Sequence, residues 1–494
     1  MRTRALALTI ITLAATFMVA RGQTNQPTAA ASEAPTLSST EQTIQDIKNP
    51  VSWFSWGADF RVRNEYFNNL LTLSSENKLH EQDYFRFRGR VWASVMPVDD
   101  LSLNARLADE VREWMQPAGY TTYKGNPGLD WREGIFDNLN VQYKNIAGLP
   151  AAITVGRQDY MPGKDSLAGD GWLLGDGTPD DGSWTYYVDS VRFSYELKDQ
   201  HTKFEAMGLI QDAFDDGWLP TINPNHLMVT EQNEKGAFVQ VANSSLKAAN
   251  LAGYFVYKSD SAVTYMKGNE VMHSGDNADI YTFGGRLTGS LDDNWQYSME
   301  GAYQFGRKAD TTIKYPEATK DSSDFRGLSA YGLNSKLSYL FKDKLNNRLD
   351  CSFELLSGDD PKTSSDEMFD VLWGRWPRWS EIGLYSYAAE TRIGQEGNLI
   401  RFGPTWTVSP MKDMDFSASY YALLALEDVP TREASSTLFS GNSNFRGHFA
   451  SAMLTYKFSR HLKGHLWSEF LFPGNYYVSR TIIPFLRAEL YFTF

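Results

Sequence analysis

Residues 169–187, GDGWLLGDGTPDDGSWTYY, resemble a binding or active site more than any other stretch, with five glycines and four aspartates in nineteen positions. They do not form a phosphate loop, because the nearby Gly163-Lys164 pair is followed by aspartate and lacks the spaced partner glycine. The alternating ligands and final glutamate of an EF-hand are also missing. A looser calcium site stays open as an alternative, with these candidate ligands: Asp170, Asp176, Asp180 and Asp181.

Arginines recur at every second position in two early stretches. ADFRVRNEYF (58–67) carries Arg61 and Arg63, and FRFRGRVWASV (85–95) carries Arg86, Arg88 and Arg90. In a membrane-spanning strand each would cost about 2–4 kcal/mol if it faced lipid near the midplane, so all five must face a polar interior. There they either pair with acids on neighbouring strands or form an electropositive track that binds carboxylate or sulfate. The sequence leaves both readings open, and they are compatible.

Residues suited to catalysis are sparse. The chain has only seven histidines and contains neither G-x-S-x-G nor H-E-x-x-H. The acid pair Asp359-Asp360 is expected in a solvated turn, and His448 and His465 are expected to be isolated lumen-lining residues. We therefore predict that the protein is not an enzyme and has no cofactor and no resident metal, apart from the calcium alternative.

A tryptophan-rich string, WGRWPRW (373–379), lies in the longest predicted loop. Trp373, Trp376 and Trp379 are candidates for stacking on sugar rings, and Arg375 and Arg378 could hold acidic sugars. The alternative is an aromatic girdle at the membrane interface, where tryptophan is enriched. Because of its place in a long loop, we favour a position at the rim or in the lumen.

The first 52 residues are expected to lie outside the main fold. Residues 1–22, with two early arginines and an apolar run of about fifteen residues, predict a secretory signal peptide rather than a spanning helix. Residues 23–52 are rich in Thr, Ala, Ser, Pro and Gln and predict a flexible periplasmic leader, with a short helix in STEQTIQDI. The single cysteine, Cys351, excludes an internal disulfide, and the net charge of −13 argues against nucleic acid.

From residue 53 to 494 apolar and polar residues alternate with a period of two, as in LSLNARL and WQYSMEGAYQF. An exported chain with 14% aromatic residues and a mean hydropathy of −0.42 is typical of a membrane β-barrel, although a secreted β-rich enzyme has similar totals. Strands of about ten residues with one apolar and one charged face favour the barrel, because strands in soluble sandwiches are nearer five or six residues.

Short and long connections alternate strictly along the chain. Tight polar turns such as PVDD (97–100) and KDKLNN (342–347) separate long loops rich in Gly, Asp, Asn and Ser. This pattern predicts short periplasmic turns and long extracellular loops. Nineteen strand candidates are found if EIGLYSYAAETRI (381–393) is included. A barrel with both ends in the periplasm needs an even number, and this candidate breaks the alternation, so we predict eighteen antiparallel strands.

The final strand, FLRAELYFTF, alternates apolar and polar residues and ends on Phe494. It resembles the assembly signal of bacterial outer-membrane barrels, whereas a soluble protein would leave this apolar edge unguarded. We therefore expect an all-β transmembrane barrel in the bacterial outer membrane. The positions opposite in parity to the apolar face predict these lumen arginines: Arg61, Arg63, Arg86, Arg88, Arg90, Arg106, Arg157, Arg192, Arg286, Arg401 and Arg487.

One block of the chain resembles a known family. REGIFDNLNVQYKNIAGLPAAITVGRQDY, the Gly/Asp loop after it, YYVDSVRFSYE and the closing FPGNYY…FLRAELYFTF are similar to the alginate export family of outer-membrane barrels. Its sharpest motif here is Gly156-Arg157-Gln158. The resemblance implies an eighteen-stranded barrel with an arginine-lined, anion-selective pathway for a polyuronate, and by motif it assigns only Arg157.

The sequence thus predicts a passive outer-membrane porin or export channel for an anionic poly- or oligosaccharide such as alginate. The alternatives are a general diffusion porin, an adhesive or structural barrel, and an outer-membrane enzyme. The expected partners are outer-membrane lipid, the saccharide and periplasmic secretion proteins.

By strand order the Gly/Asp loop is the third extracellular loop, so we predict that it folds inward and narrows the pore. Its glycines permit the bend, and its aspartates would contact lumen arginines. Deletion of residues 165–183 should raise single-channel conductance in planar bilayers. An unchanged conductance would make the segment a surface loop.

Overall fold

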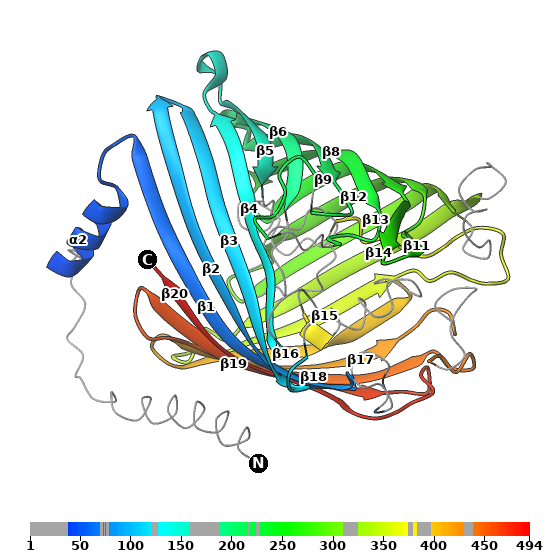
Figure 1. The fold of residues 1–494 in the computed structure, drawn as a ribbon. Coiled ribbons are helices and arrows are strands. Elements are labelled where there is room, and N and C mark those ends of the chain that lie inside the picture. The colour runs from blue at the N-terminus through cyan, green and yellow to red at the C-terminus, as the bar shows by residue number, and fades with distance from the viewer. Residues whose placement is uncertain are drawn as a thin grey trace.

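The barrel is seen in a computed structural model that describes residues 38–69, 73, 75, 79–120, 127–158, 187–215, 217–223, 228–309, 325–373, 379–382, 397–428 and 438–494. Within these residues eighteen antiparallel strands form one closed sheet, as predicted (Figure 1). Each strand pairs with its neighbour in the chain, and β1 pairs with the final strand β20, with Glu65 opposite Arg487. Closure leaves the sheet without an open edge.

The barrel strands are β1 (Phe54–Asn68), β2 (Glu81–Val98), β3 (Leu101–Gln116), β4 (Leu129–Tyr143), β5 (Ala151–Gln158), β6 (Val188–Leu197), β7 (Thr202–Gln211), β8 (Asn233–Leu246), β9 (Ala249–Ser261), β12 (Ala278–Ser290), β13 (Trp295–Ala309), β14 (Phe325–Leu340), β15 (Arg348–Leu356), β16 (Leu399–Met411), β17 (Met414–Leu424), β18 (Phe445–Lys457), β19 (Leu462–Pro473) and β20 (Ile483–Thr493). The remaining elements are α2 (Ser39–Lys48), the 3-10 turns Ile146–Gly148 and Lys198–Gln200, and the hairpin of β10 (Val263–Lys267) and β11 (Glu270–Ser274).

Side-chain alternation separates the two faces of the wall. In β1 the Phe60 side chain is 48% exposed on the outer face, whereas its neighbour Arg61 is 0% exposed on the inner face. In β2 Val91 points outward and Arg90 inward in the same way. Successive residues of a strand point to opposite faces, so a period of two in the sequence becomes an apolar exterior and a charged interior.

The connections follow the predicted alternation of short turns and long loops. In the turn between β14 and β15, the Asp343 carboxylate accepts backbone N–H groups of Leu345 and Asn347, and these hydrogen bonds hold its pKa below the ordinary value. The long connection between β9 and β12 contains the β10–β11 hairpin, which the sequence did not predict. The part of EIGLYSYAAETRI from 383 onward lies outside the described residues.

Helix α2 matches the short helix expected in the leader and lies outside the barrel, near the C-terminal end (Figure 1). Ser38 caps it by accepting the N–H of Glu41, and Trp56 Nε1 donates to the carbonyl of Ile47. His461 Nε2 lies 3.3 Å from a Glu41 carboxylate oxygen. Among the described residues, no helix is long and apolar enough to cross a membrane.

Gly284 on β12 makes room for an aromatic side chain inside the wall. A β-carbon at this position would overlap the Tyr254 ring, whose hydroxyl donates to Glu300 at 2.9 Å. Gly284→Val should lower the free energy of unfolding by about 1–3 kcal/mol, because it overpacks this site. Denaturant titration of the barrel in lipid vesicles measures the change. Gly253→Val is the control, because a β-carbon there meets no heavy atom within 4 Å; equal losses for both variants would contradict the argument.

Candidate functional site

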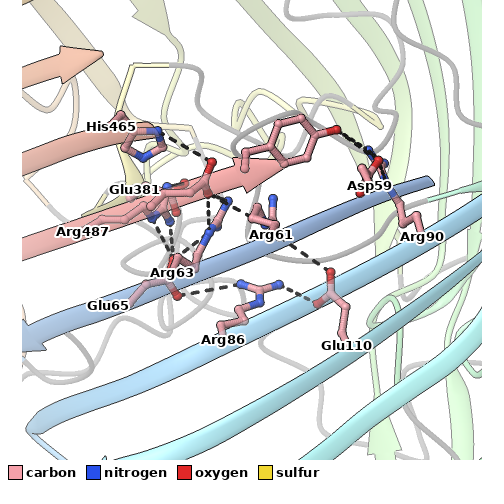
Figure 2. A network of polar contacts seen from close by, with 12 residues as sticks. Asp59, Arg61, Arg63, Glu65, Arg86, Arg90, Glu110, Glu381, His465 and Arg487 are labelled. Atoms are coloured by element: carbon pink, nitrogen blue, oxygen red, sulfur yellow. Dashed lines mark hydrogen bonds and ion pairs between the residues drawn. The ribbon is translucent and has the colours of Figure 1, made fainter. Parts of the chain in front are cut away.

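Strands β1 and β2 bring arginines face to face inside the barrel. Arg61 lies opposite Arg88 and Arg63 lies opposite Arg86 in the register of the two strands. All four side chains are fully buried or nearly so. Arg487 from β20 lies beside Arg63 (Figure 2). Like charges directly opposite each other destabilise a sheet, so this arrangement requires compensating anions.

Three glutamates from neighbouring strands supply this compensation. Glu489 of β20 accepts from Arg63 Nε at 2.8 Å, and Glu110 of β3 accepts from Arg86 Nη2 at 2.8 Å. Glu65 of β1 accepts from Arg487 Nε at 2.9 Å. Arg61 bridges two of the acids at longer range, with atoms 3.9 Å from Glu110 and 3.8 Å from Glu489. The result is one continuous network around the β20–β1–β2–β3 seam (Figure 2).

A second group lies nearer the short-turn end. Arg90 Nε donates to both carboxylate oxygens of Asp59, at 3.1 and 2.9 Å. Tyr491 donates its hydroxyl to Asp59 at 3.0 Å. Arg90 is therefore held by an acid on the neighbouring strand, and its Nη2 also donates to the Tyr491 hydroxyl.

Arg88 differs from the rest of the cluster. Its side chain is 1% exposed, and among the described residues its Nε and Nη2 have no hydrogen-bond partner. Within the part of the chain that the structure describes, no carboxylate lies within ion-pair distance of it. A buried guanidinium without an acid is costly, and it is suited to binding an anion from outside the protein.

The other predicted lumen arginines also face inward, and each contacts an acid. Arg157 makes two hydrogen bonds to Asp189, and its guanidinium lies 3.9 Å from the Tyr187 ring centroid. The remaining pairs are Arg106 with Asp137 at 2.7 Å, Arg192 with Glu205 at 3.7 Å, Arg286 with Glu300 at 3.9 Å and Arg401 with Glu354 at 2.9 Å. Pairing across strands, one of the two readings left open by the sequence, is thus common.

The connection between β15 and β16 enters the barrel interior. At Asp370 it contacts the wall: the carboxylate lies 3.5 Å from Lys258 Nζ and 3.6 Å from Lys308 Nζ. Gln304 of β13 exchanges two hydrogen bonds with the Asp370 backbone. The Trp373 ring fills the space beside Gly236 of β8 and is 1% exposed.

Residues 379–382 of the same connection contact the opposite wall. The Glu381 carboxylate accepts from Arg487 Nη1 at 2.9 Å. Glu469 of β19 accepts from the Ser380 hydroxyl at 3.0 Å and from the Ile382 N–H at 2.8 Å. β8 is eight steps from β20 in a ring of eighteen strands, so residues 370–373 and residues 379–382 contact nearly opposite walls.

The structure locates only part of the predicted binding groups. Trp373 and Trp379 lie inside the barrel, but the Trp373 ring is covered by the wall. Trp379 lies under Arg401, 4.9 Å from the ring centroid, with Tyr421 and Phe449 at its edges. Trp376, Arg375 and Arg378 lie outside the described residues, as do the Gly/Asp-loop residues Asp170, Asp176, Asp180 and Asp181. The stacking, calcium and third-loop predictions stay predictions.

Two sequence interpretations were wrong. Asp359 is not in a solvated turn: its carboxylate is 2% exposed and pairs with Arg326 of β14 at 2.8 Å. His448 does not line the lumen, because it is exposed on the outer face and hydrogen-bonds the Tyr420 hydroxyl at 2.7 Å. His465 does face inward, 3.7 Å from Glu489. In both errors a polar residue was interpreted without the neighbouring strand that contacts it.

Comparison with known proteins agrees with this architecture. A family model described as alginate export matches residues 52–482. Solved barrels with similar folds include Pseudomonas aeruginosa OccK5 (OpdH), with 11% identity, 89% of this chain and 97% of that chain covered, and a TM-score of 0.50. Acinetobacter baumannii OccAB1 has 8% identity, coverages of 89% and 96%, and a TM-score of 0.53. P. aeruginosa OccK8 (OprE) has 9% identity, coverages of 89% and 98%, and a TM-score of 0.52. No curated protein sequence matches the chain.

A closed barrel of eighteen strands with a lipid-facing apolar exterior and a charged interior defines an outer-membrane channel of the porin type. The chain belongs to the alginate export family, whose model covers nearly the whole barrel. It resides in the bacterial outer membrane.

Removing Glu65 tests whether the network stabilises the barrel. Glu65→Gln should lower the free energy of unfolding by about 3–5 kcal/mol, because it leaves the fully buried Arg487 and Arg63 with fewer anions. Asp293→Asn is the control, since that carboxylate is 93% exposed in its 3.4 Å pair with Lys342, and it should change stability by less than about 0.5 kcal/mol. The free energy of unfolding is measured by denaturant titration in lipid vesicles. Equal values for both variants and the wild type would contradict a stabilising role of the network.

Proposed function

We propose that the protein is a passive channel for an anionic poly- or oligosaccharide, alginate-like in carrying a carboxylate on its sugar units. The observation that carries this proposal is the arginine cluster of β1, β2 and β20, in which Arg88 is buried and has no acid within ion-pair distance among the residues that the structure describes. A chain of uronates presents carboxylates at regular intervals, and guanidinium groups bind carboxylates in a bidentate manner. The saccharide passes without chemical change.

Most lumen arginines are paired, which refines the electropositive-track hypothesis. A paired arginine mainly supports the wall, whereas Arg88 has hydrogen-bonding capacity left for a substrate. The other predicted lumen arginines would then contribute chiefly through the positive electrostatic potential that they create in the lumen. This potential raises the local concentration of anions. The described residues of the β15–β16 connection that pack into the barrel, Asp370 and Glu381 among them, favour a selective pathway over general diffusion, because they take up space inside the wall.

Other parts of the path can be assigned on the same proposal. The Trp379 ring is the stacking surface that best fits a sugar, because it is only partly buried, whereas the Trp373 ring is 1% exposed. The short-turn end of the barrel, where α2 contacts His461, is the end that a periplasmic secretion partner would meet.

Arg88→Gln tests the proposal against a charge-matched control. In planar bilayers, oligouronate should block the wild-type current and a neutral dextrin of the same length should not. Arg88→Gln should weaken the block by about tenfold, since a charge-assisted hydrogen bond contributes about 1.5–3 kcal/mol. Arg90→Gln removes the same charge from a residue already held by Asp59, so it should weaken the block less.

Comparing Arg88→Gln with Arg90→Gln separates direct binding of the carboxylate from the effect of the lumen's overall positive charge. Equal effects of the two variants would show that only net charge matters. The absence of any block by oligouronate, with no anion preference in the wild type, would overturn the proposed substrate class.

A further inference from the structure

We propose that the outer face of strands β8, β9, β12 and β13 binds a phosphorylated lipid of the outer leaflet. Basic side chains at the extracellular end of these strands contact the phosphate, and aromatic rings nearer the middle of the membrane contact the acyl chains. The four strands are neighbours in the barrel (Figure 1). Because the site lies on the lipid-facing side of the wall, it is independent of what passes through the lumen.

A row of polar side chains crosses these strands at the end that leads into the long loops. In the strand register Lys235 lies opposite Ser259, and Ser259 lies opposite Asp279. Asp279 in turn lies opposite Arg307. All four have the parity of the lipid-facing side chains in their strands. The cost of an outward cation falls steeply toward the membrane interface, so two cations and one acid can face outward at this level.

Arg307 is held in place without being enclosed. Its Nε and Nη2 donate to Asp279 at 2.9 and 2.7 Å, and its guanidinium lies 4.9 Å from the Phe325 ring centroid. The Tyr257 hydroxyl donates to the other oxygen of Asp279 at 2.9 Å. The Arg307 side chain is still 53% exposed. A guanidinium fixed along one edge presents its remaining N–H groups to a phosphate in a set direction.

Lys235 supplies the second cation of the row. Its side chain is exposed on the outer face of β8, and no carboxylate of the described residues lies within ion-pair distance of it. Three interstrand steps of about 4.8 Å each separate the Lys235 and Arg307 backbones. Two long side chains can narrow this span, so both can approach one headgroup.

The outer face next to this row carries an aromatic platform, which consists of Phe255, Tyr281, Phe283 and Phe305. The Tyr281 and Phe305 rings lie 5.3 Å apart at an interplanar angle of 20°, and the Phe283 and Phe305 rings lie 6.0 Å apart at 14°. Phe283 is 56% exposed and Phe305 is 38% exposed. Aromatic residues are common at this depth in any barrel. Here, however, Phe305 is two residues from Arg307 on the same strand face, so one lipid can contact the platform and the cation together.

The opposite side of the barrel has the reverse charge at the same level. β2 and β13 are nine steps apart in the ring of eighteen strands. Among the described residues, the charged outward side chains near the extracellular ends of β2 and β3 are Glu81, Asp83 and Glu113. Asp83 accepts from Asn64 at 2.7 Å, and Glu81 accepts from the Tyr66 hydroxyl at 3.1 Å. Acids repel phosphate, so the charge complementarity to a phosphorylated lipid is confined to the β8–β13 side.

Native mass spectrometry of the purified barrel in detergent measures lipid binding directly. The probe is diphosphoryl lipid A, a phosphorylated glycolipid of bacterial outer leaflets, and the comparison is its dephosphorylated form. The wild type should bind the phosphorylated form more tightly. Arg307→Gln should weaken that binding by about tenfold, since it removes charge-assisted hydrogen bonds to the phosphate. It should leave binding of the dephosphorylated form unchanged.

Two matched pairs of variants separate the site from general effects. Lys235→Gln should weaken binding of the phosphorylated form by about fivefold, the effect of one basic residue at a charged membrane surface. Lys342→Gln removes the same charge from an exposed side chain at the short-turn end and should have no effect. Phe305→Ala should weaken binding of both lipid forms by the same factor, whereas Phe402→Ala, at an outward position of β16 that is 47% exposed, should not.

Three results would overturn the lipid site. Equal affinity of the wild type for the two lipid forms would show that the phosphate is not recognised. Equal losses for Lys235→Gln and Lys342→Gln would show that only net charge matters. Complete release of lipid A by millimolar inorganic phosphate would make free phosphate the ligand. Because none of these measurements involves a saccharide or a current, their failure leaves the proposed channel function standing.

Discussion

A guanidinium group that is removed from water must have an anion, and much of this barrel follows from that requirement. Arginines cannot face lipid, so the period-two pattern turns them inward, where strand pairing sets Arg61 against Arg88 and Arg63 against Arg86. Glutamates from β1, β3 and β20 then become obligatory at the same level. The network thus connects the first strands to the last one. It also leaves Arg88 as a buried cation whose charge the wall does not satisfy by direct contact.

The same requirement explains how a connection between strands can be held inside a polar lumen. Asp370 and Glu381 are each positioned by cations of the wall, so the connection is seated by charge as well as by the packing of Trp373. Asp370 contacts two lysines and Glu381 contacts Arg487, so cations of the wall hold the described residues of the connection at both walls.

Local pattern in the sequence predicted the wall well and the interior poorly, for a physical reason. Strand parity depends on adjacent residues, so alternation in FRFRGRV suffices to place Arg86 and Arg88 inside, and turns such as KDKLNN carry their own capping groups. The seat of Asp370 depends on Lys258, Gln304 and Lys308 from strands distant in the chain. Asp359 resembled a turn residue because nothing near it in sequence revealed Arg326. The inward arginines could be predicted, but the sequence could not show that Arg88 has no acid within ion-pair distance among the described residues.

The pairing of Glu65 with Arg487 joins residues 422 positions apart, at the seam where the first strand meets the last. The two charges can pair only after the last strand has been made and has paired with the first strand to close the barrel. Both side chains face the lumen, and a slip of the β1–β20 register by one residue would turn Arg487 toward lipid and separate it from Glu65. The pair therefore fixes the register at which the cylinder closes.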